Sequence, residues 1–443
     1  MGIMKERVAI IGAGPAGCAA AHAHARRGAE VTLYERHDAI GGRTLTYRAL
    51  DDHVDTGAGF ITDFYPRLWA LADELGFRDE IGQLQRVTGL VSEGRLATLD
   101  IGSPLSLLRF PFVSLGDKFK IAAWTAKLSF KRGALDIASA KSLAQIDNES
   151  VKDHCVRKLG ENLYHFLVRP GIEPFWYFRS EDVSAALAIG LTAHAAGARF
   201  YHLRHGIDRI CHHLSRDVHV QTKSHIESIS PSSERLSVQG SHDGQPIREE
   251  FDRVIVATTA SVANRITTEL EAPWITSSQR EFLTSQAYVP NIHIAFRVPM
   301  LPEAPGVNAV FPTGPGKAPI AALSFHHFKS DPKRQKSHEL ISVFFATEES
   351  ARIMSWTDDE IAARAIELAR GLYPAFPEDA DIYHIARRDE AIPLHAVGRY
   401  KLAARFLDEQ RANSSPLQFC GDYLATATVD GAIATGLSTA AKD

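Results

Sequence analysis

The hydrophobic residues of this 443-residue chain begin with two short apolar runs that flank an Ala-rich segment. Residues 7–11 and 30–34 are runs of strand length, and residues 16–27 between them have the composition of a helix. Much later, residues 251–266 combine the pattern of a buried strand with a turn of small residues. These patterns predict a strand–helix–strand unit at the start of the chain and a further buried strand far from it.

Two longer regions carry other patterns. Residues 67–77 and 142–167 place apolar residues at helical spacing among charged ones. Residues 288–345 contain β-branched and aromatic runs separated by Pro and Gly turns, which is typical of strands. Residues 357–373 again have the spacing of a helix. The sequence therefore predicts an α/β protein with one helical insertion and one insertion built as a mixed sheet.

Composition narrows the class of protein. The net charge of −4 and the pI near 6.6 give no indication of a nucleic-acid partner. The four cysteines lie far apart without C-x-x-C spacing, and the histidines form no metal motif, so we expect no metal site. The first apolar run starts almost at residue 1, and no uncharged run reaches the roughly 20 residues of a membrane span. These features predict a cytoplasmic protein with reduced thiols.

Three glycines follow the first predicted strand in the order G-x-G-x-x-G, at Gly12, Gly14 and Gly17. The first permits a tight turn, the second lets backbone approach a pyrophosphate, and the third lets helix pack against strand. Amide groups and the dipole at the helix N-terminus favour negative charge there. Glu35 ends the second strand, where it can accept hydrogen bonds from an adenosine ribose. Together these positions predict a dinucleotide site rather than a simple turn.

The residues that follow extend this motif. Arg36 comes directly after the acid, and the chain continues with Gly41-Gly42-Arg43 and then Asp55-Thr56-Gly57-Ala58. This pattern resembles the FAD-binding region of the flavin amine oxidase superfamily, which includes monoamine and polyamine oxidases, protoporphyrinogen oxidase, phytoene-type desaturases and UDP-galactopyranose mutase. The resemblance implies FAD as cofactor, with the forked donors of Arg43 directed at a phosphate or a flavin carbonyl. Residues 393–400, which match the attachment region of amine oxidases, contain no cysteine, so we expect non-covalent FAD.

Two distant segments resemble the same family. Residues 251–266 resemble the strand that returns to the FAD sheet, and Ile226 matches a position that packs against the adenine. Near the C-terminus, Gly421-Asp422 closes a strand and a helix begins near Val429, where its amides would face the flavin pyrimidine. The cofactor-binding residues that the resemblance implies are Gly12, Gly14, Pro15, Ala16, Gly17, Glu35, Arg36, Gly41, Gly42, Arg43, Gly57, Ala58, Gly59, Phe60, Ile226, Ala257, Thr258, Gly421, Asp422, Val429, Asp430, Gly431 and Ala432.

The FAD segments lie far apart in the sequence, so the resemblance implies a discontinuous, Rossmann-like FAD-binding domain. Its predicted parts are residues 1–95, 205–285 and 385–443. The helical insertion, 96–204, and the mixed-sheet insertion, 286–384, would form the substrate domain. No second G-x-G-x-x-G follows a predicted strand, so we expect the organic substrate itself to reduce the flavin.

Two positions depart from the amine oxidases of this family. Those enzymes place a lysine in the strand facing flavin N5 and an aromatic residue before the C-terminal signature, whereas this chain has His293 and Thr428. Residues 141–188 and the Ala391-Ile392-Pro393 segment instead resemble protoporphyrinogen oxidases. Charged residues at 201–206 replace the Pro-Gly-Gly turn that is usual there. The resemblance is thus closer to the protoporphyrinogen oxidase-like branch than to classical monoamine oxidases.

Three residues are candidates for the chemistry. His293 has the ordinary pKa range of a general base or an anchor for water, and Arg204 offers donors to a substrate carboxylate. Tyr177 belongs to an aromatic cluster that would suit the wall of an apolar pocket. A hydrogen-bonded residue inside a sheet and a core aromatic are the alternative interpretations of the histidine and the tyrosine.

The implied reaction is FAD-dependent dehydrogenation of a small organic molecule. A hydride would leave a C–H bond, in a C–N group or a reduced ring, and the electrons would pass to O2 or another electron acceptor. The alternatives are a protoporphyrinogen oxidase proper, a classical amine oxidase, a non-redox mutase or isomerase, and a flavin-stabilised binding protein without turnover.

A basic amphipathic segment covers residues 105–135. On a helix, Lys120 and Trp124 share one face while Phe119 and Phe130 share another. Such a segment can lie in an anionic membrane surface, and its position resembles the membrane-docking region of protoporphyrinogen oxidases. We favour the alternative of a solvated basic helix over the substrate pocket, in which the tryptophan packs against protein.

Overall fold

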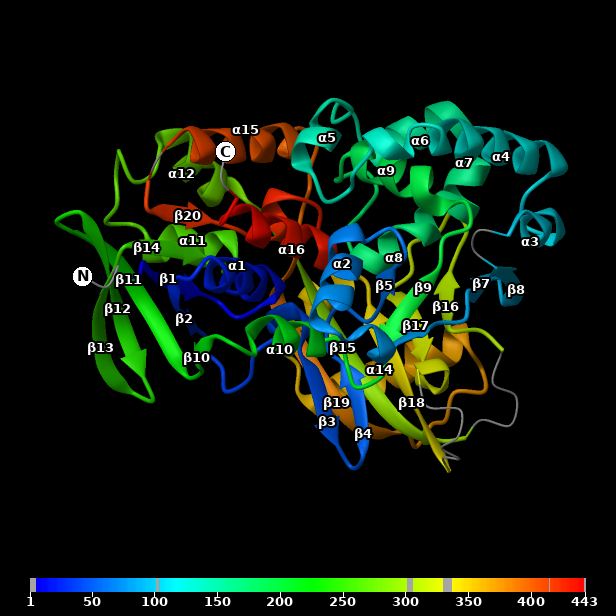
Figure 1. Ribbon diagram of the computed structural model, residues 1–443. Coiled ribbons are helices and arrows are strands. Elements are labelled where there is room, and N and C mark those ends of the chain that lie inside the picture. The colour runs from blue at the N-terminus through cyan, green and yellow to red at the C-terminus, as the bar shows by residue number, and fades with distance from the viewer. Residues whose placement is uncertain (1–4, 101–102, 301–305, 330–336, 414, 442–443) are drawn as a thin grey trace.

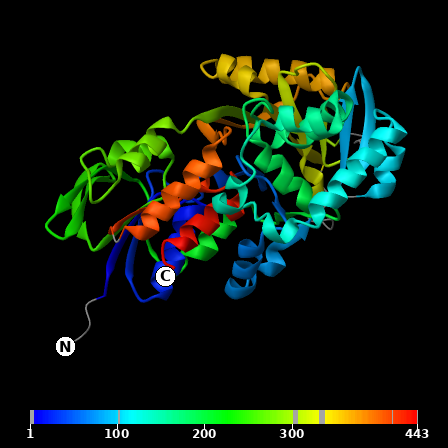
Figure 2. The ribbon, with the colours of Figure 1, turned by 90° about the horizontal axis from the view of Figure 1, so that it is seen from above.

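The computed structural model describes residues 5–100, 103–300, 306–329, 337–413 and 415–441. Its elements form a parallel sheet with its helices, a mixed sheet, and a region made of helices (Figure 1). Seen from above, the helical region and the mixed sheet lie on the same side of the parallel-sheet region (Figure 2). This arrangement is the α/β architecture that the sequence predicts.

The parallel sheet has five strands in the order β10–β2–β1–β14–β20. The predicted strands at residues 7–11 and 30–34 are β1 and β2. On their two sides they pair with β14 and β10 from the middle of the chain, and β14 in turn pairs with β20 from its end. Three remote segments therefore build one sheet, as the discontinuous fold requires. The strands are β1 (Arg7–Ile11), β2 (Glu30–Tyr34), β10 (His219–Gln221), β14 (Arg253–Val256) and β20 (Leu417–Phe419).

Helices cover one face of this sheet, and an antiparallel sheet with further helices covers the other. Along β1, Val8 and Ile10 join the first core while Ala9 and Ile11 join the second, as the alternation of a strand dictates. The first core is closed by α1 (Pro15–Arg26), α2 (Pro66–Leu75), α10 (Arg209–Ser215) and α16 (Val429–Ser438). The second is closed by β11 (Ser224–Ser232), β12 (Arg235–His242), β13 (Gln245–Phe251), α11 (Ala260–Ile266), α12 (Ser277–Ser285) and α15 (Arg399–Ala412).

The mixed sheet has seven strands in the order β19–β15–β18–β17–β16–β7–β8. One face is apolar and packs against α13 (Thr347–Ile353) and α14 (Asp358–Leu372), whereas the other face is the side on which His293 lies. The predicted boundary at residue 95 falls inside the β7–β8 hairpin, both of whose strands belong to this sheet. The strands are β7 (Val87–Ser92), β8 (Arg95–Asp100), β15 (Tyr288–Pro299), β16 (Ala309–Pro312), β17 (Ile320–Phe325), β18 (His338–Phe345) and β19 (Asp381–Pro393).

Two small sheets connect these regions. The hairpin of β3 (Thr46–Ala49) and β4 (Asp52–Asp55) leads into the glycine-containing segment at 57–59. The second sheet has the order β5–β9–β6 and joins residues near 60 to residues near 200. Its strands are β5 (Ile61–Thr62), β6 (Ile81–Gln83) and β9 (Phe200–Leu203).

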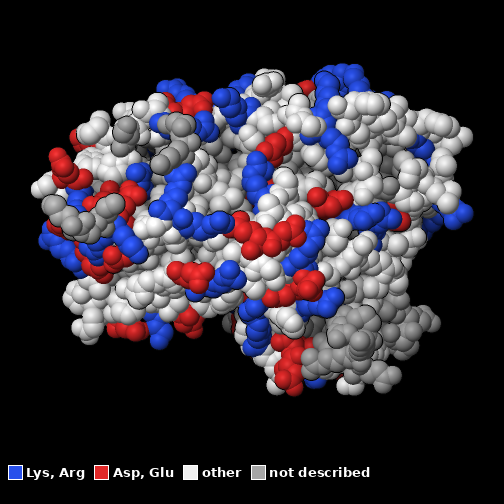
Figure 3. Space-filling model, in the orientation of Figure 1, with Lys and Arg blue, Asp and Glu red and all other residues white. Residues whose placement is uncertain are grey.

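The helical region contains the basic segment at 105–135. In α4, Trp124 packs against the helical core, while Phe119 in the same helix and Phe130 just after it are 66% and 92% exposed. Within the described ranges no helix is long and apolar enough to cross a bilayer. Basic and acidic side chains are interspersed on the face shown in Figure 3. The helices are α3 (Pro104–Arg109), α4 (Leu115–Ser129), α5 (Ala140–Ala144), α6 (Val151–Leu159), α7 (Glu161–Leu163), α8 (Glu173–Trp176) and α9 (Ala185–Ala195).

The crossing of α1 and α16 depends on Gly436, and we predict that Gly436→Ala destabilises the fold. A Cβ at this position would lie 2.1 Å from the carbonyl oxygen of Ala16, which is backbone and cannot move aside cheaply. We expect a loss of about 1–3 kcal/mol in the free energy of unfolding, from overpacking. Gly371→Ala is the matched control: nothing lies within 4 Å of its added Cβ, and stability should stay equal or rise slightly. Thermal unfolding measures both, and equal stability of the two variants would contradict the prediction.

Candidate functional site

The three glycines of the first motif form a backbone cradle at the C-terminal end of β1. Gly12 has φ +104°, and a Cβ there would lie 2.8 Å from the carbonyl oxygen of Ala257. A Cβ on Gly17 would lie 1.8 Å from the carbonyl oxygen of Gly12, so helix and strand can approach this closely only at glycine. Pro15 occupies the first turn of α1, where its fixed φ suits a helix start. These sterics leave the α1 N-terminus open toward the second glycine motif.

The second glycine motif lies directly against the first. Gly41 and Gly42 both have positive φ, of +127° and +54°. The Gly41 N–H donates to the carbonyl of Ala13 at 2.9 Å, and a Cβ on Gly42 would lie 3.3 Å from the Cα of Gly14. The two loops thus form one floor of bare backbone beside the start of α1, which is the geometry that a diphosphate needs.

Glu35 is fixed beside this floor. Its carboxylate accepts hydrogen bonds from the backbone N–H groups of Ala13 and His37, both at 3.0 Å, and the side chain is buried. Arg36 is exposed and donates to the ring of His37. The acid that the sequence assigns to the ribose therefore stands at the edge of the cradle in a single orientation.

Arg43 and Asp422 join the two ends of the chain. The guanidinium donates to Asp422 Oδ1 at 2.7 Å and to the carbonyl of Ala391 at 3.3 Å. Gly421 precedes this aspartate, and its N–H donates to Thr435 on α16. The Arg43–Asp422 ion pair therefore stands between the glycine cradle and α16.

At the start of α16, Asp430 is engaged within the protein. Its carboxylate accepts from the N–H of Leu68 at 2.9 Å and from Arg67 at 3.2 Å, and burial raises its pKa. Thr428 caps the helix by accepting from the Gly431 N–H at 3.0 Å. Asp430 thus holds α2 against α16. Val429, Gly431 and Ala432 are buried beside it.

The remaining predicted cofactor residues fall into two places. Ile226 is buried beneath the parallel sheet, and Ala257 and Thr258 follow β14 next to Gly12. The segment from Gly57 to Phe60 instead lines a cavity between the parallel-sheet region and the mixed sheet. The cradle and the cavity are therefore connected by this one segment.

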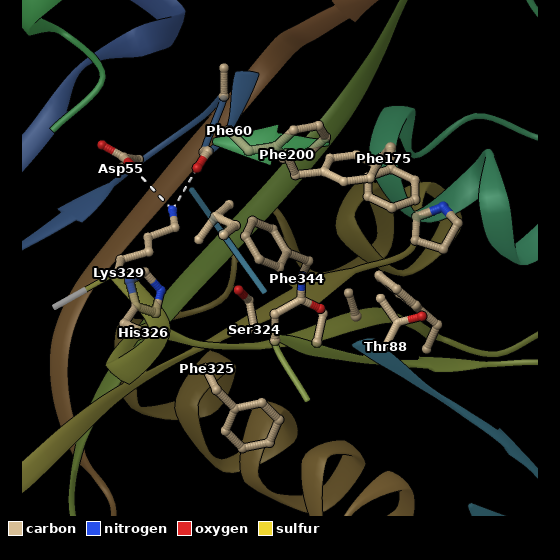
Figure 4. Close-up of a pocket in the computed structure, with 18 of the residues that line it drawn as sticks. Asp55, Phe60, Thr88, Phe175, Phe200, Ser324, Phe325, His326, Lys329 and Phe344 are labelled. Atoms are coloured by element: carbon tan, nitrogen blue, oxygen red, sulfur yellow. Dashed lines mark hydrogen bonds and ion pairs between the residues drawn. The ribbon is translucent and has the colours of Figure 1, made fainter. Parts of the chain in front are cut away.

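The cavity has a volume of about 150 Å³ and is mostly apolar. Aromatic side chains from five elements or their flanks surround it, and Phe325 points away from it toward the helix below (Figure 4). The described residues that line it are Asp55, Gly57, Ala58, Gly59, Phe60, Leu84, Arg86, Thr88, Pro174, Phe175, Tyr177, Phe200, Asn308, Ala309, Phe311, Ala322, Ser324, Phe325, His326, Lys329 and Phe344.

A buried ion pair closes one end of the cavity. Lys329 Nζ lies 3.1 Å from Asp55 Oδ2 and donates to the carbonyl of Gly59 at 2.6 Å (Figure 4). Burial opposes ionisation of Asp55, but Lys329 and two hydrogen-bond donors, Thr46 and Ile207, keep the pKa of this carboxyl below its usual value. The lysine therefore neutralises the acid and fixes the cavity-lining segment.

His293 lies behind the cavity wall rather than in it. Its Nε2 is 2.7 Å from Ser342 Oγ, which is 2.8 Å from Nε2 of the cavity-lining His326, and its ring stacks on Phe344 with centroids 4.6 Å apart. Burial, with smaller contributions from nearby cations, lowers the pKa of His293 to about 3. The histidine is therefore neutral near pH 7, and it contacts the cavity lining through Ser342, which bonds His326, and through the ring of Phe344.

The other two catalytic candidates occupy contrasting places. Tyr177 lines the cavity, has φ +60°, and stacks on Phe344 with centroids 6.0 Å apart. Arg204 is exposed after β9, and it does not belong to the described cavity lining. Sequence reasoning missed Lys329, Ser342 and His326. Of these three residues, only His326 carried a signal in the sequence, because it is adjacent to a second histidine, His327.

The chain resembles known proteins over its whole length. The model of the family described as flavin containing amine oxidoreductase matches residues 15–442. Protoporphyrinogen oxidase 2 of Arabidopsis thaliana is 30% identical over 172 residues, which cover 38% of this chain and only 32% of the plant protein. The chain thus spans about a third of that relative's length.

Two solved structures show the same fold. Cyclohexylamine oxidase from Brevibacterium oxydans IH-35A superposes with a TM-score of 0.71 at 18% identity, covering 99% of this chain and 98% of the other. Wild-type putrescine oxidase bound to putrescine gives a TM-score of 0.71 at 19% identity with the same coverage. The family match extends from the first turn of α1 to beyond the last described helix, and the chain belongs to the flavin-containing amine oxidoreductase family.

Proposed function

We propose that this protein is an FAD-dependent oxidoreductase that dehydrogenates a small, largely apolar organic molecule. The observation that carries the proposal is the continuity of the segment at 57–60, which follows the hairpin beside the glycine cradle and then lines the aromatic cavity. A substrate in the cavity would thus lie next to the cofactor that the cradle suits.

The residues of the cradle fit FAD bound without a covalent link. Gly14 and Gly42 leave backbone exposed for the diphosphate, Glu35 stands at the ribose position, and Arg43 is held by Asp422 toward the flavin end. FAD supplies the hydride-accepting chemistry when it is bound.

The protein contributes positioning and exclusion of water. Phe175, Phe200 and Phe344 supply flat apolar walls that would orient a ring or alkyl substrate against the segment at 57–60. Lys329 holds that segment through the Gly59 carbonyl, so the wall next to the cofactor is rigid. Reoxidation by O2, or by another electron acceptor, completes the proposed cycle.

A mutase that acts on a sugar nucleotide is the weaker alternative. Such a substrate would require several cations to bind its diphosphate. The described cavity lining offers only Arg86 and Lys329, and both are paired with carboxylates. The cavity is therefore better suited to an apolar molecule.

The first test is anaerobic reduction of the bound flavin by a panel of amines, amino acids, a porphyrinogen and cyclic imine precursors. We expect one class to bleach the visible flavin band, peroxide to form when air is admitted, and FAD to separate from the protein on denaturation. Activity that appears only after dithionite reduction and addition of a sugar nucleotide would favour the mutase. A protein that takes up no FAD would contradict the proposal.

Filling the cavity should block the substrate but spare the cofactor. We predict that Ala322→Phe slows reduction by the substrate that the panel identifies by about tenfold or more, because the new ring occupies space between the aromatic walls. Reduction by dithionite should be unchanged. The control is Ala363→Phe, the same substitution at an exposed position of α14. Equal rates of substrate reduction in both variants would place the substrate elsewhere.

The neutral state of His293 has a consequence for stability against pH. Because its pKa is about 3 when folded but near 6.5 when unfolded, the unfolded state binds an extra proton between these values, and acidification below pH 6.5 favours unfolding. Lowering the pH from 7.5 to 5.5 should cost about 1.4 kcal/mol through this residue. We predict that His293→Gln removes that part of the pH dependence, as measured by chemical unfolding at both pH values.

His225→Gln is the matched control, the same substitution at an exposed histidine on β11. The same variants test the catalytic interpretation of His293. A fall in the rate of flavin reduction centred near pH 6.5 in the wild type, and absent in His293→Gln, would contradict the neutral, internally bonded histidine described above.

A further inference from the structure

The charged groups in the cavity wall cancel in pairs. Asp55 is the single carboxylate among the described lining residues, and it is paired with Lys329. Arg86 is paired with Asp100 at 3.2 Å. The lining therefore offers no carboxylate that could bind an ammonium group without losing an existing partner.

Arg388 on β19 is different, because its guanidinium has only neutral partners in the described part of the chain. It donates to the carbonyl and the hydroxyl of Thr56, the latter at 2.8 Å. The acids that follow it on the strand are directed elsewhere: Asp389 is exposed, and Glu390 accepts from Thr259 at 2.6 Å. Arg388 is thus a cation held in place by the protein but not neutralised by it.

Arg388 lies between the predicted cofactor-binding residues and the cavity. Thr56 immediately precedes Gly57, which lines the cavity. Arg388 also lies near Arg43, on the cofactor side, and near the phenol of Tyr177, which lines the cavity and is neutral near pH 7 because burial raises its pKa. The guanidinium therefore stands at the junction where the reacting parts of cofactor and substrate would meet.

A cation at this junction would be stabilised by a nearby negative charge. Burial, reinforced by repulsion from Arg43, lowers the pKa of Arg388 to about 10, so the group stays protonated at neutral pH. Arg388 is partly buried. A desolvated charge without an opposite charge is costly, and a planar anion that accepts two parallel hydrogen bonds is the partner that guanidinium suits best. His293 and His384 also face this region, and burial lowers the pKa of both, so both are neutral near pH 7 and add no further positive charge beside Arg388.

We propose that Arg388 is an anion-binding residue at the junction of the FAD site and the cavity, and that its partner is a planar anion from outside the chain. This inference rests on the proposed function, since it assumes that FAD occupies the cradle. The anion has two possible sources: the carboxylate of an apolar acid in the cavity, or the pyrimidine ring of the reduced flavin, which carries negative charge. In the first case the substrate class is an apolar carboxylic acid rather than a free amine.

The test uses FAD-loaded wild type, Arg388→Met and Arg388→Lys, with benzoate as the probe and neutral benzamide as its isostere. Binding is followed through the absorbance of the oxidised flavin, and the midpoint potential of the bound flavin is measured separately. A substrate-carboxylate role predicts that Arg388→Met weakens benzoate binding by about tenfold or more, leaves benzamide binding unchanged, and does not alter the potential. Arg388→Lys should be intermediate, since it keeps the charge without the fork.

If Arg388 instead stabilises the reduced flavin, its substitution should change the midpoint potential and not the affinity for benzoate. Arg388→Met would then shift the ratio of oxidised to reduced flavin about tenfold toward the oxidised form, a fall of about 30 mV for a two-electron couple, with benzoate binding unchanged. Arg387→Met is the control: it lies on the same strand, is bound to Asp358 and the carbonyl of Trp356, and should change neither quantity.

Each remaining outcome is decisive. If wild type and Arg388→Met agree in benzoate affinity and in potential, the anion-binding role is overturned while the proposed function stands. If Arg388→Met does not retain FAD, the same two measurements on Arg388→Lys decide, because loss of the fork alone should still weaken whichever anion is bound. If the wild type takes up no FAD, both proposals fail.

Discussion

The carboxylate of Asp55 binds three segments that are distant in the sequence, and the site depends on this contact. One oxygen accepts from Thr46 in the β3–β4 hairpin and from the N–H of Ile207 ahead of α10, and the other meets Lys329 beyond β17. The buried charge requires such partners, and removing any of them would leave a desolvated ion. The parallel-sheet region and the mixed sheet are therefore held together at the point where the cradle passes into the cavity.

The mixed sheet extends this constraint by presenting two different faces. Residues such as Ile292 and Ile294 point into an apolar core, while His293 between them points toward Ser342 and the cavity wall. The strand register fixes which residues are cross-strand neighbours: His293 pairs with Phe344 on β18, and Asn291 pairs with Arg388 on β19. His293 on β15, Ser342 on β18 and His326 just after β17 thus form a row of polar groups across the sheet beside the aromatic lining.

These two constraints explain how much of the fold and of the site could be predicted from the sequence. The cradle is local, because Gly12, Gly14 and Gly17 need only their own spacing and the strand before them to be recognised. The same holds for β1 and β2, whose bounds match the apolar runs. The roles of the polar row depend instead on pairing between strands far apart in the chain, which no local pattern records. Arg388 stands in a run of charged residues that gives no apolar alternation, so nothing marked it as facing inward.

The difference between local and assembled features also bears on what family membership implies. A Cβ on Gly17 would collide with backbone, so the cradle tolerates almost no change while the fold persists. The cavity wall is assembled from side chains of several elements, and its charges can be altered without moving the backbone that carries them. Structures only 18–19% identical to this chain therefore share its fold, and a shared fold does not fix the substrate. In this chain the acid in the wall is already neutralised by Lys329, and the unneutralised charge at the junction is the cation Arg388. Under the proposed function, electrostatics at this junction therefore favour a neutral or acidic substrate over an ammonium ion, within a fold that is shared with amine oxidases.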